Sequence, residues 1–111
     1  MNNRDKQIID HILTHYKEMQ DELAMVNDLF EEYLKNNLVR KAIKMDLLNI
    51  GENANQLSDE SKSQLNSKDL RGAVDFRNQI THGYVTIKEE MLWDTIHNNL
   101  PPFINSIQNL K

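Results

Sequence analysis

The chain has 111 residues, of which 39% are hydrophobic and 27% are charged, and its formal net charge is −4. This length predicts one domain, residues 1–111, and the composition is that of a folded globular protein rather than a disordered one. The absence of cysteine excludes disulfides, thiolate metal sites and cysteine nucleophiles. The acidic balance disfavours a tight, non-specific nucleic-acid binder but leaves room for a local basic site.

Only three glycines and two prolines occur, so long helices with few connections are favoured over an all-β fold. No apolar run approaches the roughly 18 residues that a membrane span needs. The first residues also lack the apolar stretch of a signal peptide. We therefore expect a cytoplasmic protein without a membrane association.

The first predicted helix covers about residues 4–26, and Asn2 or Asn3 is expected to cap its start. Apolar residues recur here every three or four positions, which places them on one helical face. They are Ile8, Ile12, Tyr16, Met19 and Leu23.

A short helix should follow, with Asn27-Asp28 as its cap and Asn36-Asn37 as its end. The next long helix has the clearest apolar face of the chain. Its members are Val39, Ile43, Leu47, Ile50, Ala54 and Leu57. Gly51 falls inside this helix at a cost of about 1 kcal/mol relative to alanine, and a glycine there often marks the close approach of another backbone.

Residues 58–68 are rich in Ser, Asp, Lys and Asn, and this composition predicts a loop. Ser67 is expected to cap a helix that begins near Asp69. Gly83 is expected to end that helix, because glycine is common just after a helix C-terminus.

The last helix is expected to start at a capping box formed by Thr86 and Glu89. Its apolar face would contain Met91, Leu92, Ile96, Leu100, Ile104 and Ile107. Pro101-Pro102 must kink or restart it, because neither residue donates a helical hydrogen bond. The predicted fold is therefore all-α, an up-down helical bundle of four main helices plus one short helix.

One short segment carries a chemical pattern. It is Arg77-Asn78-Gln79-Ile80-Thr81-His82-Gly83-Tyr84. It has an arginine, then four residues, a histidine, one further residue and a tyrosine. This pattern resembles the R-x4-6-H-x-Y signature of HEPN domains. The chain therefore resembles that family.

Other parts of the chain resemble the HepT-like ribonuclease toxins (DUF86) within the HEPN family. Ile50-Gly51-Glu52 is similar to their I-G-E element, and Trp93 and Leu100-Pro101 are similar to their last helix. The resemblance spans about residues 8–108. One departure is that relatives often have a Pro-Trp pair before the motif helix, where this chain has Ser67-Lys68-Asp69-Leu70.

RNA can be cleaved without a metal if a base removes the 2′-OH proton and another group stabilises charge on the phosphorane. Histidine suits the first task because imidazole ordinarily has a pKa of about 6.5, which makes His82 the candidate base. Arg77 suits the second, since its planar guanidinium binds phosphate through two parallel hydrogen bonds. Asn78 is expected to orient His82 or the phosphate.

Five residues correspond to about 140° of rotation on an ideal helix. Arg77 and His82 therefore do not share a face unless the helix end unwinds, which favours a cleft completed by a second subunit. The resemblance implies such a homodimer, with two Arg-His pairs facing one groove.

The resemblance also implies a partner, an MntA-type nucleotidyltransferase antitoxin. Tyr84 would accept AMP groups from this enzyme, and the added anionic nucleotides would repel RNA phosphates. The alternatives are structural: Tyr84 as a packed aromatic residue, Asn78 as a helix-surface residue, and Arg77 with His82 as a pair that ties two helices together.

Two groups of basic residues are candidates for contact with the RNA backbone. Lys68 and Arg71 lie close to the motif and are the better candidates. Arg40, Lys41 and Lys44 form a second group that we interpret as a solvated face.

His11 and His15 have a spacing that can bind a metal. No third ligand is evident from the sequence, so we expect no metal site and no cofactor. His97 is expected to be solvated.

The function predicted from the sequence is a metal-independent RNA endonuclease that acts as the toxin of a toxin-antitoxin pair. Its RNA substrate is transfer RNA or message, and the sequence does not choose between them. The alternative is a non-catalytic HEPN binding module that partners a nucleotidyltransferase. A third possibility is a helical adaptor in which the motif serves packing alone.

Overall fold

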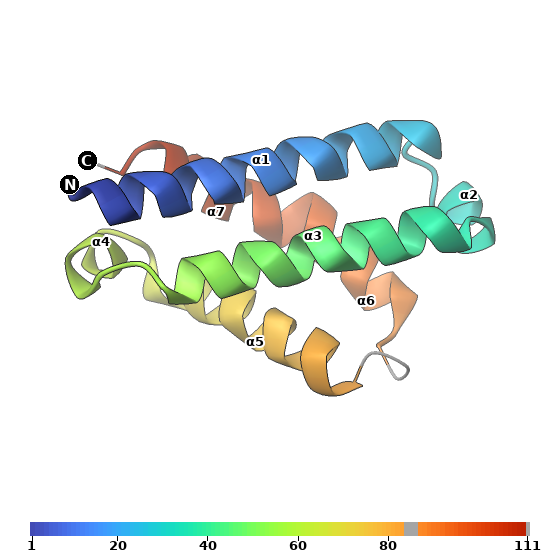
Figure 1. The fold of residues 1–111 in the computed structure, drawn as a ribbon. Helices are drawn as coiled ribbons and strands as arrows, with labels where there is room; N and C mark the ends of the chain where they lie inside the picture. Colours follow the sequence, from blue (N-terminus) through green and yellow to red (C-terminus); the bar gives the residue numbers. More distant parts are fainter. Residues whose placement is uncertain (84–86, 111) are drawn as a thin grey trace.

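The computed structural model describes residues 1–83 and 87–110, and over these residues it is helical with no strand (Figure 1). Its helices are α1 (Asn3–Met25), α2 (Phe30–Lys35), α3 (Asn37–Asn55), α4 (Asp59–Ser63), α5 (Ser67–Gly83), α6 (Glu89–Asp94), the π-helix η1 (Thr95–Asn99) and α7 (Leu100–Gln108).

Helices α1 and α3 lie side by side and run in opposite directions, and α5 packs against the other side of α3 (Figure 1). The continuous run of α6, η1 and α7 lies behind them and returns the chain toward its N-terminus. The all-α, up-down bundle predicted from the sequence is therefore confirmed. Its four main helical segments are accompanied by two short helices, α2 and α4, where one was expected.

The start of α1 is as predicted, because the side chain of Asn2 accepts a hydrogen bond from the backbone N–H of Asp5. The prediction for the next turn is wrong. Asn27 and Asp28 have positive φ values of 56° and 52° and form the turn itself, while Leu29 precedes the first residue of α2. Asparagine and aspartate tolerate this left-handed conformation better than most residues.

The loop predicted over residues 58–68 contains a helix, α4, which the side chain of Ser58 caps. Buried Asp5, which is 1% exposed, accepts hydrogen bonds from the backbone N–H of Ser58 at 3.0 Å and from the Ser61 hydroxyl at 2.6 Å. It also accepts one from the Ser58 hydroxyl. These bonds hold the pKa of Asp5 below its usual value, and they attach α4 to the start of α1.

The start of α5 also differs from the prediction. The side chain of Asn66, and not Ser67, accepts hydrogen bonds from the backbone N–H groups of Lys68 at 2.9 Å and Asp69 at 3.2 Å. The helix ends at Gly83, as expected. Thr86 of the predicted capping box lies outside the described residues, and α6 begins at Glu89.

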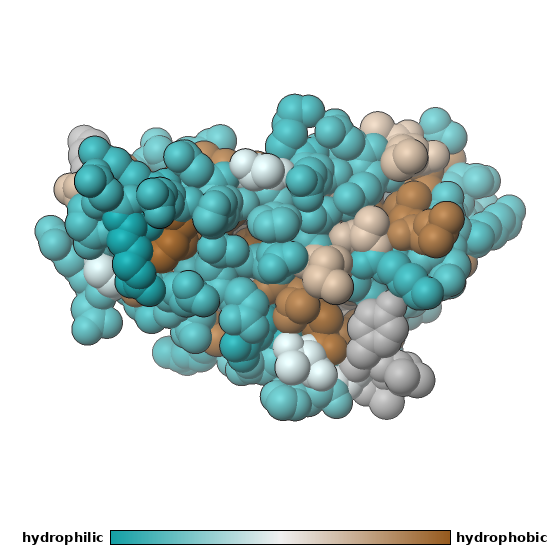
Figure 2. Space-filling model, viewed as in Figure 1, coloured by the Kyte–Doolittle hydropathy of each residue, from teal (hydrophilic) through white to brown (hydrophobic). Residues whose placement is uncertain are grey.

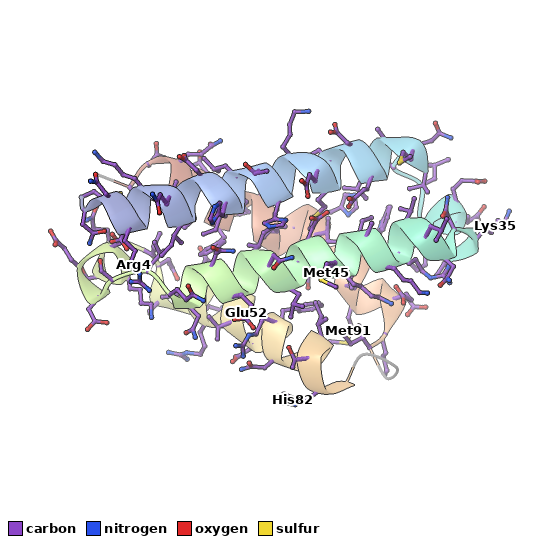
Figure 3. The ribbon with its side chains drawn as sticks, in the orientation of Figure 1. Arg4, Lys35, Met45, Glu52, His82 and Met91 are labelled. Atoms are coloured by element: carbon purple, nitrogen blue, oxygen red, sulfur yellow. The ribbon has the colours of Figure 1, made fainter. Side chains whose placement is uncertain are left out.

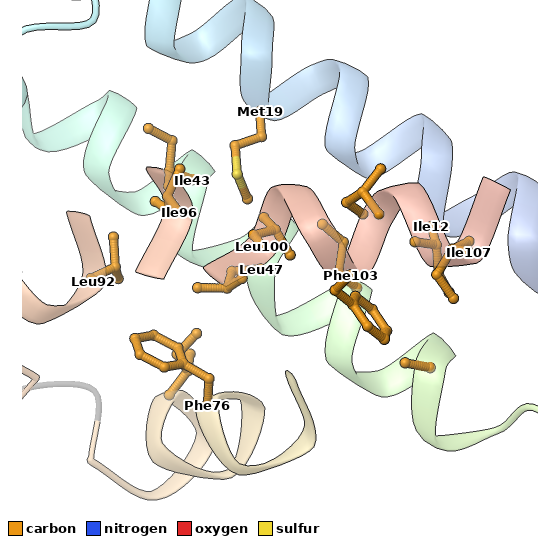
Figure 4. Packing of buried hydrophobic residues seen from close by; sticks show 14 of the residues in the cluster. Ile12, Met19, Ile43, Leu47, Phe76, Leu92, Ile96, Leu100, Phe103 and Ile107 are labelled. Carbon is orange, nitrogen blue, oxygen red and sulfur yellow. The ribbon is translucent and has the colours of Figure 1, made fainter. Parts of the chain in front are cut away.

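The core lies where the long helices and the C-terminal run meet (Figure 4). All six residues of the apolar face predicted for α3 are buried, and so are four of the five predicted for α1, with Tyr16 partly buried. In the C-terminal run the prediction is wrong for Met91, which is 55% exposed. Because the predicted apolar faces are the ones that the core buries, the apolar spacing predicted the helical bundle correctly.

The two prolines lie in the first turn of α7, where a missing N–H costs least. The preceding turn widens into η1, in which the N–H of Leu100 bonds to the carbonyl of Thr95. The α-helix therefore restarts at Leu100, as predicted from Pro101-Pro102. Across the described residues, no helix combines the length and apolar character needed to span a bilayer.

The basic group predicted as a solvated face is solvated only in part: Lys41 is exposed, whereas Lys44 and Arg40 are held by other helices. Lys44 is 6% exposed and pairs with Glu89, which also accepts a hydrogen bond from the Tyr33 hydroxyl. Arg40 donates to the carbonyl groups of Tyr33 and Leu34 at the end of α2. Both cations therefore stabilise helix contacts and are not free for RNA.

The expectation of a solvated His97 is also wrong. Its Nε2 lies 2.7 Å from an oxygen of Asp28, and its Nδ1 lies 2.8 Å from the carbonyl of Trp93. The indole of Trp93 packs against Phe30 and Tyr33. These contacts attach the C-terminal run to the turn that follows α1.

Candidate active site

The position of α5 depends on the absence of a side chain at Gly51. A Cβ atom there would lie 2.5 Å from Cβ of Arg77 and 2.8 Å from the carbonyl oxygen of Ala73. Both distances are too short for real contacts, so α3 and α5 approach each other more closely than an alanine would allow. The close backbone approach predicted at Gly51 is confirmed.

Arg77 lies at this close contact and is held by its neighbours. Its Nε donates a hydrogen bond to Oε1 of Glu52 at 2.7 Å, and another guanidinium nitrogen donates to the side-chain oxygen of Asn78. The carboxylate of Glu52 raises the pKa of Arg77 above its already high ordinary value. The Arg77 side chain is 24% exposed, so it is a fixed cation that solvent still reaches.

His82 lies one helical turn after Asn78 and has an exposed side chain. Both residues line an open hollow of about 500 Å³ between the end of α5 and the start of α6. Figure 3 shows His82 at the end of α5, on the side away from α3. The other lining residues are Gln79, Gly83, Ile87, Lys88 and Met91.

The structure brings Asn78 and His82 to one hollow, but Arg77 does not line it. Helix α5 continues through Gly83 without unwinding. Arg77 therefore faces α3 and His82 faces the hollow, in keeping with the rotation expected from five residues. Asn78 connects them, because it contacts Arg77 through its side-chain oxygen and shares the hollow with His82.

A second hollow of about 390 Å³ continues along α5 and has Lys68 and Arg71 in its lining. It shares Gln79 and Met91 with the first hollow, so the two hollows are neighbours beside α5. Arg71 precedes His82 by eleven residues, or about 16 Å along a helix. Lys68 and Arg71 therefore lie along α5 at a distance from His82 and not beside it.

This side of the molecule also exposes apolar side chains. Met45 and Met91 are 56% and 55% exposed. Figure 2 shows apolar atoms gathered where α3 passes over α5 and α6, within a surface that is otherwise mostly hydrophilic. Met45 and Met91 lie between α3 and the end of α5 that carries His82 (Figure 3).

The role of Glu52 was not foreseen from the sequence, although the residue belongs to the Ile50-Gly51-Glu52 element. The available signal was its position directly after a glycine that marks a close helix contact, since a carboxylate there can reach a cation on the facing helix. Tyr84, the expected AMP acceptor, lies outside the described residues.

Comparison with known proteins decides the family. A family model described as Ribonuclease HepT-like matches residues 6–110. The chain belongs to this family. A HepT-like assignment fits the helical bundle and the exposed His82 beside Asn78 and Arg77, and it gives the chain a ribonuclease-type function at the level of the family.

One curated relative supports the same assignment. It is a protein of Methanocaldococcus jannaschii named "Putative RNase", and it is 29% identical over 93 residues, which cover 83% of this chain and 77% of the relative. No solved structure matches this HepT-like chain significantly.

Proposed function

We propose that this HepT-like protein is a metal-independent RNA endonuclease and the toxin of a toxin-antitoxin pair in the cytoplasm. The observation that carries the proposal is the arrangement on α5, where an exposed His82 and Asn78 share an open hollow and Asn78 contacts the guanidinium of Arg77. The match to the HepT-like ribonuclease family supports the choice of RNA as the substrate.

In the proposed reaction, His82 removes the proton from the 2′-OH of a nucleotide held in the hollow. The 2′ oxygen attacks the adjacent phosphorus and the bond to the 5′ oxygen breaks. The products are a 2′,3′-cyclic phosphate and a 5′-hydroxyl, whose oxygen takes up a proton from the imidazolium or from water. Asn78 orients the phosphate or the imidazole.

Arg77 would stabilise the phosphorane charge. Its guanidinium faces α3 and not the hollow, but the side chain is 24% exposed, so we expect it to reach a phosphate that lies across a groove shared by two copies of the chain. We propose a homodimer in which the two copies of α5 face one groove. The exposed Met91, which lines the hollow, and the exposed Met45 near it support this arrangement, since exposed apolar patches commonly mark protein interfaces.

We propose that an MntA-type nucleotidyltransferase neutralises the toxin by transferring AMP from ATP to the hydroxyl of Tyr84, with release of pyrophosphate. Tyr84 is two residues after His82 in the chain. Added phosphates close to the groove would repel RNA. Mass spectrometry of the chain incubated with the enzyme and ATP tests this step, with Tyr84→Phe as the control that must remain unmodified.

The experiment that tests the proposed function compares cell growth and transfer-RNA length after tight induction of the wild-type chain, His82→Ala and His11→Ala. His11 is exposed on α1 and is a matched control. Growth arrest with shortened RNA in the wild type and in His11→Ala, but not in His82→Ala, is the expected result. A folded wild-type protein that causes neither arrest nor RNA cleavage would favour the alternative, a non-catalytic module that binds a nucleotidyltransferase.

A further inference from the structure

A second group of chemically active side chains lies between α1 and α3, on the side of α3 that faces away from α5 (Figure 1). Nδ1 of His15 lies 3.0 Å from Oδ1 of Asp46 and 3.5 Å from Oε2 of Glu18. One ligand atom from each residue lies within 4.8 Å of the others. The sequence offered His15 only His11 as a fellow ligand, whereas the fold adds Asp46 from 31 residues further along.

Asp46 is the buried member of this group and is 4% exposed. Its Oδ1 is the oxygen that lies 3.0 Å from Nδ1 of His15. Its carboxylate also shares a hydrogen bond with the carboxyl group of the neighbouring Glu22, so it is held from both sides.

We propose that His15, Glu18 and Asp46 bind a divalent transition-metal ion, of which Zn²⁺ is the best match, and that the ion links α1 to α3. Zn²⁺ binds imidazole nitrogen and carboxylate oxygen at about 2.0–2.2 Å, which places two tetrahedral ligands about 3.3 Å apart. The observed separations of 3.0 and 3.5 Å bracket that value. Mixed imidazole and carboxylate ligands suit Zn²⁺ better than Mg²⁺ or Ca²⁺, which prefer oxygen alone.

The exposure of the three side chains indicates where a metal ion would enter. The side chains of His15 and Glu18 are 26% and 53% exposed, whereas that of Asp46 is 6% exposed. An ion would therefore enter from the α1 surface and displace a proton from His15 if it carries one. The site lies on the opposite side of α3 from the contact between Glu52 and Arg77, so its role is structural and separate from the proposed RNA cleavage.

Calorimetric titration of the chelator-treated full chain with ZnCl₂ tests the proposal. We expect one ion per chain, and at least a tenfold weaker affinity in His15→Gln, Glu18→Gln and Asp46→Asn. His11→Gln and Asp21→Asn are matched controls, since both residues are exposed on α1 outside the cluster, and they should bind as the wild type does. Glu18 is exposed enough that its variant should fold normally.

Thermal unfolding supplies a second readout. Free Zn²⁺ at about 100 times its dissociation constant should raise the Tm of the wild type by on the order of 10 °C, and it should leave Glu18→Gln almost unchanged. The proposal is overturned if the wild type binds no Zn²⁺, if Glu18→Gln binds equally well, or if His11→Gln abolishes binding. The first two results would make the cluster an ion pair only, and the third would indicate a surface pair of histidines.

Discussion

Replacing Gly51 by alanine tests the close contact that positions α5. The new Cβ would lie 2.5 Å from Cβ of Arg77 and 2.8 Å from the carbonyl oxygen of Ala73. Neither atom is the far end of a flexible side chain, so relief requires the two helices to separate. We expect lower stability and, because Arg77 moves with α5, weaker RNA cleavage.

The magnitude follows from two opposing effects. Alanine is favoured over glycine inside a helix by about 1 kcal/mol, while overpacking costs about 1–3 kcal/mol and occasionally more. Contact with a backbone carbonyl places Gly51→Ala at the upper end of that range. The net loss in unfolding free energy should be about 2 kcal/mol, which corresponds to a fall in Tm of roughly 10 °C for a domain of this size.

Gly72 provides the matched control on α5. A Cβ atom there would meet nothing within 4 Å, so Gly72→Ala should gain up to about 1 kcal/mol from helix propensity alone. Urea and thermal unfolding of both variants measure the difference. A Gly51→Ala variant as stable as the wild type would refute the close helix contact from which Arg77 is positioned.

Three further predictions concern charged side chains. The folded-state pKa of Asp5 is depressed below 3.8, so the stability that Asp5 contributes is present above about pH 4 and is lost as the pH falls through the folded pKa. Asp5→Asn should lose about 1–3 kcal/mol of unfolding free energy at pH 7. Urea unfolding between pH 7 and pH 3 should then show an unfolding free energy that falls less steeply with acid than in the wild type. Glu52→Gln should change the unfolding free energy by less than about 1 kcal/mol, since the ion pair between Glu52 and Arg77 is partly exposed. If Glu52 positions Arg77, the same variant should slow RNA cleavage roughly 10- to 100-fold. Unchanged cleavage would argue against that role. Exchanging Lys68 and Arg71 for glutamine should weaken RNA binding and reduce the slope of log affinity against log salt by up to about 1.4, and an unchanged slope in a filter-binding titration would remove both residues from the interface.

Much of the fold was accessible from the sequence because apolar spacing reports directly which helix face is buried. The complete burial of the α3 face is the clearest example. Capping and turn residues were less predictable, because several polar residues near each boundary are chemically suitable. Asn66 caps α5 where Ser67 was expected, and Asn27 and Asp28 form a left-handed turn where a cap was expected.

The site was predictable only in part. The motif identified the helix that carries Arg77, Asn78 and His82, but it contained no information on what faces each side chain. Contacts such as that between Arg77 and Glu52, 25 residues apart, depend on tertiary packing. The same limit explains why Lys44 was assigned to a solvated face although the structure buries it against Glu89.

The most direct test of the central claim is cleavage of an end-labelled RNA by the purified chain, with and without EDTA, compared with His82→Ala of equal Tm. We expect products that end in a 2′,3′-cyclic phosphate, in a yield that the chelator does not diminish and that falls at least 100-fold in His82→Ala. Equal cleavage by His82→Ala, or cleavage that disappears with EDTA while the protein stays folded, would contradict His82 as the base of a metal-independent ribonuclease.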